Sequence, residues 1–490
     1  MIDLKEFIKR EEKQKDGRKT IIKLEQGKSY CINETICLQT ETLIDGNGAV
    51  IQNNADIGLM ISASETELKN LKIFGGGISI QIDNKGKSIE NIAIENCELK
   101  NYMLSGLVLG TGESGGTTSR VCVKDCVIST DPMKKDDGTD NVIALDILIT
   151  AGLSDKKNIE NVLVTGVEID NCKISGHSIC NIMSVPGLSL NPDFTPIFSN
   201  CAIENVQVTN SELTGSDDTA FAAQANYINN EACYCRNFTM YGNEIEFGLT
   251  GLSASAGSPM TGKVENIFFK KIKIANNRLT GRKNVGETRT AIGIGAGGID
   301  YKPAICNKCG VEDVEIIGNT ISECERGITV SAGHSMIDAD APSELRKNYV
   351  KRVVIKNNEL RDVQNCFIFY AAWIEGRRFD WNWGLHHTTQ TWLAPVQNHH
   401  EKTVTASENY IENLLCEGNY CDGFSYLLHA ASVMARGHGL VNGNEIIKDF
   451  VFKENKYKNG EEHIRVCDTI LEDWVTDGGN NILEQKNILI

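Results

Sequence analysis

The sequence predicts an all-β protein that forms one long right-handed parallel β-helix of about ten coils. Three observations indicate this fold class. Short segments of alternating apolar and polar residues recur along the chain, and each is followed by Asn or Gly. Glycine is abundant, with 45 residues, and proline is scarce, with 8, which suits many tight turns without proline-rich linkers. The connections are too short for the helices of a βαβ fold, so the chain is expected to coil as a ribbon.

The repeat combines two strands around an Asn or Gly turn with a third, apolar strand. It is visible in strand pairs such as IENIAIENCELKN from Ile89 and NIFFKKIKIANNRLTG from Asn266, and in third strands such as AIGIGAG from Ala291 and GITVSAG from Gly327. These segments recur roughly every 25 to 45 residues. A β-propeller would need four evenly spaced strands per blade, and a leucine-rich repeat would need the LxxLxL pattern, which is absent. Both alternatives are therefore less favoured than the β-helix.

Residues 1–19 are predicted to form an amphipathic N-terminal cap, because Leu4, Phe7 and Ile8 share one helical face. Such caps protect the open end of a solenoid. Residues 20–490 are then expected to form the β-helix domain, with long loops inserted between its strands. The insertions, where specificity usually lies, are expected at 131–142, 185–200, 282–290, 298–310, 334–348 and 374–405.

Charge and cysteine usage restrict the partners and the compartment. The net charge is −16 and no Lys/Arg-rich run occurs, which argues against a nucleic acid partner. The N-terminal residues are charged throughout and lack the apolar region of a secretory signal, and no apolar run is long enough to cross a membrane. The 17 cysteines are scattered and odd in number, as expected of reduced thiols. We therefore predict a cytoplasmic protein with no membrane partner.

The segment IIKLEQGKSYCINETICLQTETLIDGNGAVIQ, residues 21–52, resembles the opening coil of the pectin-lyase-like superfamily. The resemblance covers nearly the whole chain in its pattern of strands and turns. It implies a right-handed parallel β-helix and, most often, a carbohydrate-active enzyme. It does not specify one reaction, because a fold hosts many functions.

The third strand of successive coils predicts a floor of small residues on one outer face. In ITVSAG, Ile328 and Val330 point inward while Thr329 and Ser331 point outward, because side chains alternate along a strand. The same register places Ser253, Ser255, Gly293 and Gly295 outward in the preceding coils, and Asp146, Tyr370 and His429 outward in more distant ones. Such a floor lets a ligand approach the backbone closely, although a bare solvated sheet face is the alternative.

Candidate catalytic groups lie in the turn that enters this floor. Asp217 and Asp218 occur in NSELTGSDDTAFAAQ, which resembles the Gly-Asp-Asp coil of polygalacturonase-like glycoside hydrolases. That resemblance implies two adjacent catalytic carboxylates, but the preceding coil here offers His177 where the family has an Asp. Glycosyl hydrolysis requires a carboxylic acid and a second carboxylate, so Glu287 in a nearby turn is a third candidate. The alternative is that the Asp pair merely caps a turn.

The remaining candidates are predicted to bind the substrate. Arg289 and Arg326 can contact hydroxyls or carboxylates, or can instead pair with Glu287 and Glu325. The Trp-rich segment within 374–405 suits stacking against sugar rings, but it also suits a subunit interface, which would make the protein a homo-oligomer. The predicted substrate-binding residues are His177, Arg289, Arg326, His334, Tyr370, Trp373, Glu375, Asp380, Trp381 and Trp383.

These features predict an intracellular glycoside hydrolase, or a related glycosyl-transferring enzyme, that acts on an oligosaccharide. A lyase or sugar epimerase is the first alternative, and a non-catalytic carbohydrate-binding solenoid is the second. We expect no cofactor and no metal. Cys306-x-x-Cys309 is only half of a zinc site, and the acidic loop of Asp136, Asp137 and Asp140 has no specific calcium-binding spacing.

Overall fold

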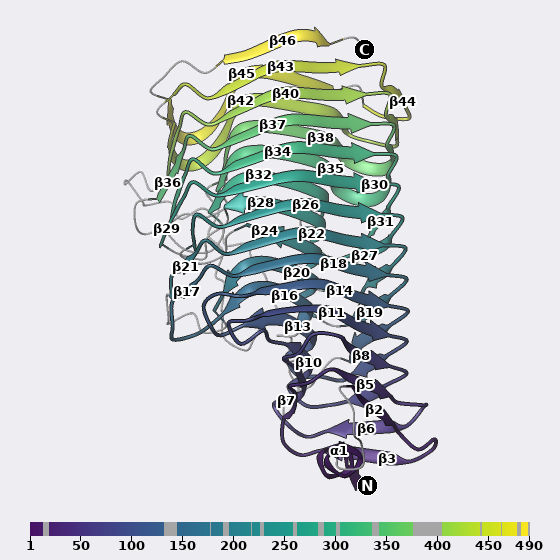
Figure 1. Ribbon diagram of the computed structural model, residues 1–490. Coiled ribbons are helices and arrows are strands. Elements are labelled where there is room, and N and C mark those ends of the chain that lie inside the picture. The colour runs from purple at the N-terminus through teal and green to yellow at the C-terminus, as the bar shows by residue number, and fades with distance from the viewer. Residues whose placement is uncertain are drawn as a thin grey trace, which may run out of the picture.

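The chain forms a parallel β-helix, as predicted, in a computed structural model (Figure 1). The described residues are 1–12, 19–131, 145–176, 178–189, 196–216, 218–225, 230–257, 262–282, 289–299, 304–335, 343–375, 404–441, 443–461, 463–477 and 482–488. The coils stack along one axis from the N-terminus to the C-terminus. Every strand pairing in the described residues is parallel, so each strand lies beside its counterpart in the next coil.

One side of the solenoid is a sheet of 14 strands, one from each coil. Its strands are β2 (Thr20–Lys23), β5 (Thr42–Asp45), β8 (Thr66–Lys69), β11 (Ser88–Glu95), β14 (Thr117–Lys124), β18 (Leu163–Asp170), β22 (Ala202–Thr209), β26 (Tyr234–Tyr241), β30 (Phe268–Ala275), β34 (Gly310–Ile317), β37 (Tyr349–Lys356), β40 (Tyr410–Glu417), β43 (Ile446–Lys453) and β46 (Ile482–Ile488). We call it the 14-stranded sheet.

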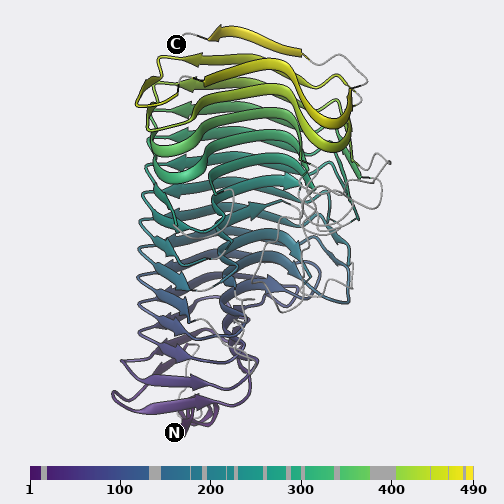
Figure 2. The same cartoon turned by 180° about the vertical axis from the view of Figure 1, so that it is seen from behind.

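A second ladder of strands carries the predicted floor and is called the floor ladder. It consists of β4 (Ile36–Leu38), β7 (Ile57–Ile61), β10 (Ile78–Ile82), β13 (Ser105–Thr111), β16 (Leu145–Leu153), β20 (Cys180–Leu188), β24 (Thr219–Gln224), β28 (Thr250–Gly257), β32 (Thr290–Ile299), β35 (Thr320–Ser335), β38 (Glu359–Glu375), β42 (Tyr426–Val441) and β45 (His463–Asp477). Figure 2, from behind, shows how the long green and yellow strands of the last coils bend around the solenoid.

Two ladders of short strands complete the coils. The corner ladder, which follows the 14-stranded sheet, consists of β1 (Ile2–Asp3), β3 (Ser29–Ile32), β6 (Val50–Asn53), β9 (Lys72–Phe74), β12 (Glu98–Lys100), β15 (Val127–Thr130), β19 (Lys173–Gly176), β23 (Glu212–Thr214), β27 (Glu244–Phe247), β31 (Arg278–Gly281), β41 (Tyr420–Asp422) and β44 (Lys456–Lys458). The side ladder consists of β17 (Ile159–Glu160), β21 (Phe198–Ser199), β25 (Asn230–Glu231), β29 (Gly262–Glu265), β33 (Ala304–Asn307), β36 (Ser343–Arg346) and β39 (Val404–Ser407).

The core consists of apolar side chains that stack in columns from coil to coil. In the 14-stranded sheet, Ile272, Val314, Val353, Leu414 and Phe450 are register partners in successive strands, and all are buried. Alternation along each strand sends every second side chain into this interior. The column is continuous, so the hydrophobic contribution to stability is distributed along the whole axis.

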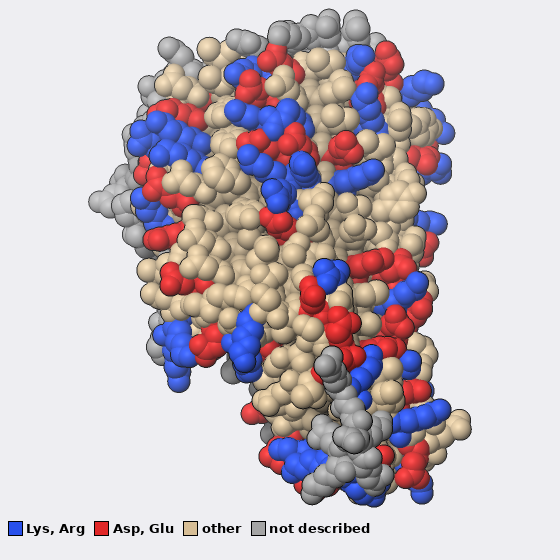
Figure 3. Space-filling view, viewed as in Figure 1, with Lys and Arg blue, Asp and Glu red and all other residues tan. Residues whose placement is uncertain are grey.

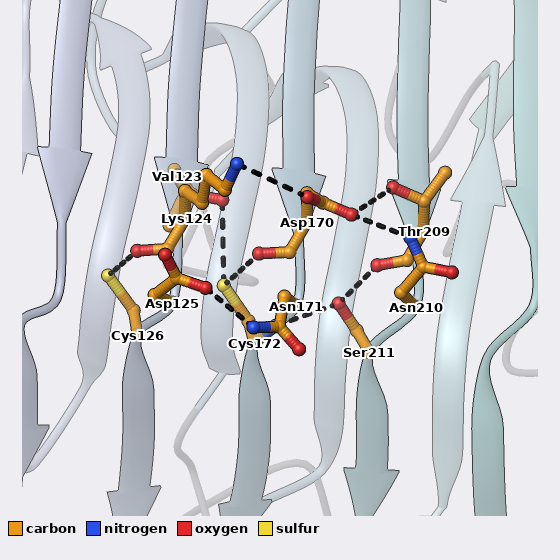
Figure 4. Close-up of polar contacts among 10 residues, drawn as sticks. All are labelled: Val123, Lys124, Asp125, Cys126, Asp170, Asn171, Cys172, Thr209, Asn210 and Ser211. Carbon is orange, nitrogen blue, oxygen red and sulfur yellow. Dashed lines mark hydrogen bonds and ion pairs between the residues drawn. The ribbon is translucent and has the colours of Figure 1, made fainter.

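The turn after each strand of the 14-stranded sheet is built by a residue in the left-handed conformation. Asn171 and Asn210 have φ of 52° and 50°, which Asn tolerates better than most residues. Side chains then link the coils, as Figure 4 shows. The Nδ2 atoms of Asn171 and Asn210 donate to Asp125 and Asp170, at 2.5 and 2.9 Å. The recurrent Asn of the repeat is thus a turn residue that joins neighbouring coils.

The predicted cap helix is present as α1 (Leu4–Glu12). Leu4, Phe7 and Ile8 are all buried, and the ring of Phe7 packs edge-on against Tyr30 with centroids 5.3 Å apart. The helix therefore covers the apolar end of the first coil, as the sequence indicated. Within the described part of the chain, no helix has the length and apolar character needed to cross a bilayer.

Two details differ from the sequence prediction. The 14-stranded sheet contains more coils than the predicted ten or so. The strands β2, β5 and β8 have four residues each, too few for a clear alternating pattern. The expected insertions are also partly strands: β20 continues to Leu188, and β21, β33 and β36 lie within the predicted loops. Strands of two to four residues have little sequence signature of their own, because their neighbours in other coils stabilise them.

Candidate ligand-binding face

The floor of small residues exists and has the predicted register. Ser253, Gly293 and Thr329 are partners in successive strands of the floor ladder. Ser255, Gly295, Ser331 and Tyr370 form the next outward column. The side chains between these columns, such as Ile294 and Val330, are buried in the core. His429 follows Thr329 and Ile368 in the first outward column, which confirms its predicted position.

The two glycines of the floor are not required by packing against the described residues. A Cβ at Gly295 would lie 3.7 Å from Oγ of Ser255 and 3.9 Å from Oγ of Ser331, which are ordinary contact distances. By contrast, a Cβ at Gly327 would collide with Leu360 and the Cys366 carbonyl. Glycine within a strand costs about 0.5–1 kcal/mol relative to Ala. Glycine at 295 is therefore typical of a place where another group approaches the backbone.

Four of the predicted substrate-binding residues come together at one end of the floor. The Cζ atom of Arg326 lies 4.4 Å from the ring centroid of Trp373, a cation–π contact. The rings of His334 and Tyr370 lie 5.6 and 5.4 Å from the Trp373 ring. The register explains this meeting, because His334 pairs with Trp373 and Ser331 pairs with Tyr370 in adjacent strands.

Tyr370 and Trp373, both predicted to bind the substrate, do not form an exposed aromatic surface. They are 3% and 6% exposed and pack with Ile368, Ala431 and Ile470 in a small apolar cluster. The faces of both rings are covered by neighbouring side chains, so they are not available to stack against a ligand. Trp373 instead contacts the half-buried Arg326 and His334. Nε1 of Trp373 is buried and has no hydrogen-bond partner among the described residues.

Three further polar residues border this cluster and were not among the predicted site residues. Asn365 and Tyr426 follow Arg326 in the same register column. The ring of Tyr426 packs against His429 with centroids 4.5 Å apart, and the Tyr370 hydroxyl lies 3.4 Å from Nδ1 of His429. Tyr426 is 38% exposed, so it presents the accessible aromatic surface here. The sequence around Tyr426 has the pattern of an ordinary strand, and only the pairing between coils places it in the column of Arg326, with Asn365 between them.

Arg289 forms an ion pair with Glu325. Its Nη2 donates to Oε1 of Glu325 at 2.9 Å, and its Nη1 donates to the carbonyl of Arg282 at 2.9 Å. Burial alone raises the pKa of Glu325, but the hydrogen bonds from Arg289 outweigh it and hold that pKa below its usual value. Glu325 is therefore ionised at neutral pH. Arg289 thus makes the ion pair with Glu325 that was the alternative to its predicted role, and substrate binding by Arg289 stays a prediction.

Of the three predicted catalytic residues, only Asp218 lies within the described residues. It precedes β24 and is half-buried at the turn that enters the floor. Its backbone carbonyl accepts hydrogen bonds from the N–H groups of Leu249 and Thr250, and its Oδ1 accepts one from the Thr219 hydroxyl at 3.0 Å. Asp218 thus has contacts that stabilise the turn. Several other predicted site residues lie outside the described residues, namely His177, Asp217, Glu287, Asp380, Trp381 and Trp383, and only the backbone of Glu375 is described.

Asp146 does not point outward, contrary to the prediction. It is completely buried, and its carboxylate accepts hydrogen bonds from the Tyr102 hydroxyl, from the Ser178 hydroxyl at 2.9 Å and from Nδ2 of Asn181 at 2.8 Å. At this corner of each coil two consecutive residues point inward, such as Ala291 and Ile292, so simple alternation fails. Burial raises the pKa of Asp146 to about 6, despite these hydrogen bonds. Its role is in the core, not on the floor.

Comparison with known proteins identifies no family for this chain. No family model matches it, and no curated protein matches it significantly. Two solved structures of PfbA, a surface protein and adhesin of Streptococcus pneumoniae, are similar over long stretches. One is 14% identical over 75% of this chain and 96% of that chain, with a TM-score of 0.33. The other is 12% identical over 86% of this chain and 87% of that chain, with a TM-score of 0.30. Similarity at this level says nothing about the ligand or activity of this chain.

Proposed function

We propose that the outer face of the floor ladder binds an oligosaccharide without covalent change. One observation carries the proposal: a floor of Ser, Thr and Gly ends at half-buried Arg326 and His334, which Trp373 holds in place. Hydroxyl, guanidinium, imidazole and amide groups offer the mixed donors and acceptors that sugar hydroxyls require. The exposed ring surface of Tyr426 adds an apolar surface for a sugar ring.

Although Ser255, Thr329 and Ser331 are only 9%, 8% and 7% exposed, two features favour a ligand at this face. The glycines at 293 and 295 have room for a Cβ atom among the described residues yet carry none. The buried Nε1 of Trp373 has no described acceptor, and an unsatisfied buried donor costs about 1–3 kcal/mol. Because Nε1 is inaccessible to solvent, a ligand hydroxyl would become its acceptor only after the side chains around Trp373 move.

The test is a glycan array followed by calorimetry on the wild type and on Gly295→Val. Valine is a good strand residue, and its Cβ would make only ordinary contacts with the described residues at this position, so we expect the fold to be preserved. Its side chain would fill the floor, and affinity for the array ligand should fall about tenfold or more, or about 1.4 kcal/mol. Arg326→Gln should also weaken binding, whereas Arg361→Gln, an exposed arginine paired with Glu359, is the matched control. Unchanged affinity in Gly295→Val would exclude binding at this face.

Hydrolysis of the bound sugar is the second candidate function, favoured by the position of Asp218. This carboxylate lies at the turn entering the floor, and Asp217 precedes it in the chain. A pair of carboxylates is the minimal catalytic equipment of most glycoside hydrolases. Wild-type protein and Asp218→Asn would be incubated with the array ligand, and products would be followed by mass spectrometry. Cleavage that disappears in Asp218→Asn while binding persists would support the hydrolase; binding without any cleavage would leave a binding protein.

A further inference from the structure

A second groove lies at the start of the 14-stranded sheet, far from the floor. It has a volume of about 590 Å³ and crosses five coils parallel to the solenoid axis. One wall consists of the first residues of β30, β37, β40 and β43, namely Phe268, Tyr349, Tyr410 and Ile446, and Gly310 occupies the equivalent position in β34. The other wall consists of the turn residues two positions earlier, Asn266, Lys308, Lys347, Glu408 and Asn444.

The aromatic wall is rigid because the coil register stacks its rings. Tyr349 and Tyr410 lie nearly parallel, at an interplanar angle of 14° with centroids 5.4 Å apart. The Tyr349 ring lies across Gly310 of the preceding coil, where a Cβ would collide with it, and its hydroxyl donates to Oε1 of Glu312 at 2.9 Å. The Nζ atom of Lys351 lies 5.0 Å from both ring centroids. These contacts fix the rings before any ligand arrives.

The opposite wall carries a small excess of positive charge in a chain of net charge −16. Glu265 is shared by Lys263 and Lys308, and Glu408 is shared by Arg346 and Lys347. Arg346 also approaches Glu344, at 4.0 Å. Figure 3 shows blue side chains gathered on the flank of the molecule where β36 lies in Figure 1. Exposed ion pairs contribute little, about 0–1 kcal/mol each, so these cations can exchange their carboxylates for those of a ligand.

We infer that this groove binds an extended oligosaccharide that carries carboxylate groups. Its sugar rings would lie along the Phe268–Tyr410 column, and its carboxylates would face Lys308 and Lys347. The groove repeats once per coil, about 4.8 Å, which suits a chain of repeating units. A peptide that extends a sheet would need a free strand edge, and here the strands are paired on both sides across the groove. Two groove lysines are too few for the salt-dependent binding of a nucleic acid.

The experiment is calorimetric titration with an oligouronate and with a neutral oligosaccharide of equal length. Tyr410→Ala should weaken oligouronate binding about tenfold, and Lys347→Gln about threefold, with the lysine effect shrinking at high salt. Lys347 is half-exposed, so its substitution leaves the fold intact even if Tyr410→Ala proves unstable. Tyr241→Ala and Lys173→Gln remove an exposed tyrosine and an exposed paired lysine elsewhere, and should change nothing.

The site is independent of the floor, and the variants distinguish the two. Gly295→Val should leave oligouronate binding at the groove unchanged, while Lys347→Gln should leave binding at the floor unchanged. Equal affinity for the neutral and the acidic oligosaccharide, or wild-type affinity for the oligouronate in both Tyr410→Ala and Lys347→Gln, would overturn the inference.

Discussion

In the turn that follows each strand of the 14-stranded sheet, one buried position is occupied by cysteine in the early coils and by asparagine in the late coils. Cys97, Cys126 and Cys172 direct their thiols at carbonyl groups of the preceding coil, with Cys126 Sγ 3.4 Å from the Ile94 oxygen. From Asn243 onward, the side-chain amide donates to the equivalent carbonyl, as Asn277 does to Met240 at 3.0 Å. Two different side chains thus satisfy the same acceptor in different parts of the solenoid.

Asparagine and cysteine differ in the hydrogen bonds that their side chains can accept. From Asn277 onward, Oδ1 of each asparagine also accepts the backbone N–H and the side-chain amide of the asparagine in the preceding coil, as Asn319 does for Asn277 at 3.0 Å each. The column Asn243, Asn277, Asn319, Asn358, Asn419 and Asn455 is therefore one continuous buried network. A thiol is a weak donor that fills the space as a small apolar group. The asparagine column should therefore stabilise its coils more than the cysteine column does.

The turn before the 14-stranded sheet shows the same change along the chain. Cys201 and Cys233 occupy its buried position in earlier coils, whereas Asn348 and Asn409 occupy it in later ones. The column ends at the fully buried Glu445, whose Oε2 accepts the N–H of Asn409 at 2.9 Å. Asparagine occupies both turns only around β37 and β40 among the described coils, and these strands lead into the long strands β38 and β42, which carry Trp373 and Tyr426.

The largest expected effect comes from interrupting the asparagine column at its centre. Asn319→Ala removes the acceptor of the Asn277 N–H and the donor to the Ile274 carbonyl, both buried. We expect a loss of about 3 kcal/mol in the free energy of unfolding, because several buried polar groups lose their partners. Denaturant unfolding followed by circular dichroism measures it. A loss below that of Cys126→Ala would contradict the proposed difference between the columns.

The free energy of unfolding should also depend on pH, because Asp146 is buried in the early coils. We expect this effect to be similar to or smaller than that of Asn319→Ala. Its pKa is raised to about 6 in the folded protein, so the folded state binds a proton more tightly than the unfolded state. Stability should therefore fall as pH rises from about 4 to 6, by up to about 3 kcal/mol, and then level off. Asp146→Asn should remove this decline in a series of thermal melts. The asparagine column carries no titratable group, so it should not make stability depend on pH. Asn319→Ala should therefore show the same change of stability with pH as the wild type.

A smaller effect is expected from truncating one member of the cysteine column. Cys126→Ala removes a buried thiol that contacts the Ile94 carbonyl, and the cost should be about 1 kcal/mol. The same denaturant experiment measures it beside Asn319→Ala. A cost equal to that of the asparagine variant would mean that both columns stabilise their coils alike.

The smallest effect should come from replacing cysteine with serine next to an existing serine. Ser211 follows Cys172 in the column, donates to the Thr209 carbonyl at 2.8 Å and accepts the Cys172 N–H at 3.1 Å. A serine at 172 can make the equivalent bond to Asp170, so Cys172→Ser should change stability by less than about 0.5 kcal/mol. A shift in melting temperature as large as that of Cys126→Ala would show that the thiol itself is required.

Much of the fold and part of the floor were predictable from residue patterns. The cap residues Leu4, Phe7 and Ile8 and the outward pair Thr329 and Ser331 follow from local periodicity alone. Asp146 was misplaced because the corner turns two successive residues inward. The burial of Trp373 also escaped prediction, since it depends on side chains from neighbouring coils, and alternation along one strand says nothing about them.

The sequence by itself determined the coil repeat, the inward columns and the turn residues, because these depend on alternation and on left-handed Asn and Gly. Only the tertiary structure decided which coils place their side chains together. The separation between stacked partners varies irregularly: it is 25 residues for Asp45 and Asn70, 61 for Asn358 and Asn419, and 36 for Asn419 and Asn455. Inserted loops of variable length hide that register from the sequence. Contacts such as Arg326 with Trp373 and Arg289 with Glu325 exist only once the coils are stacked.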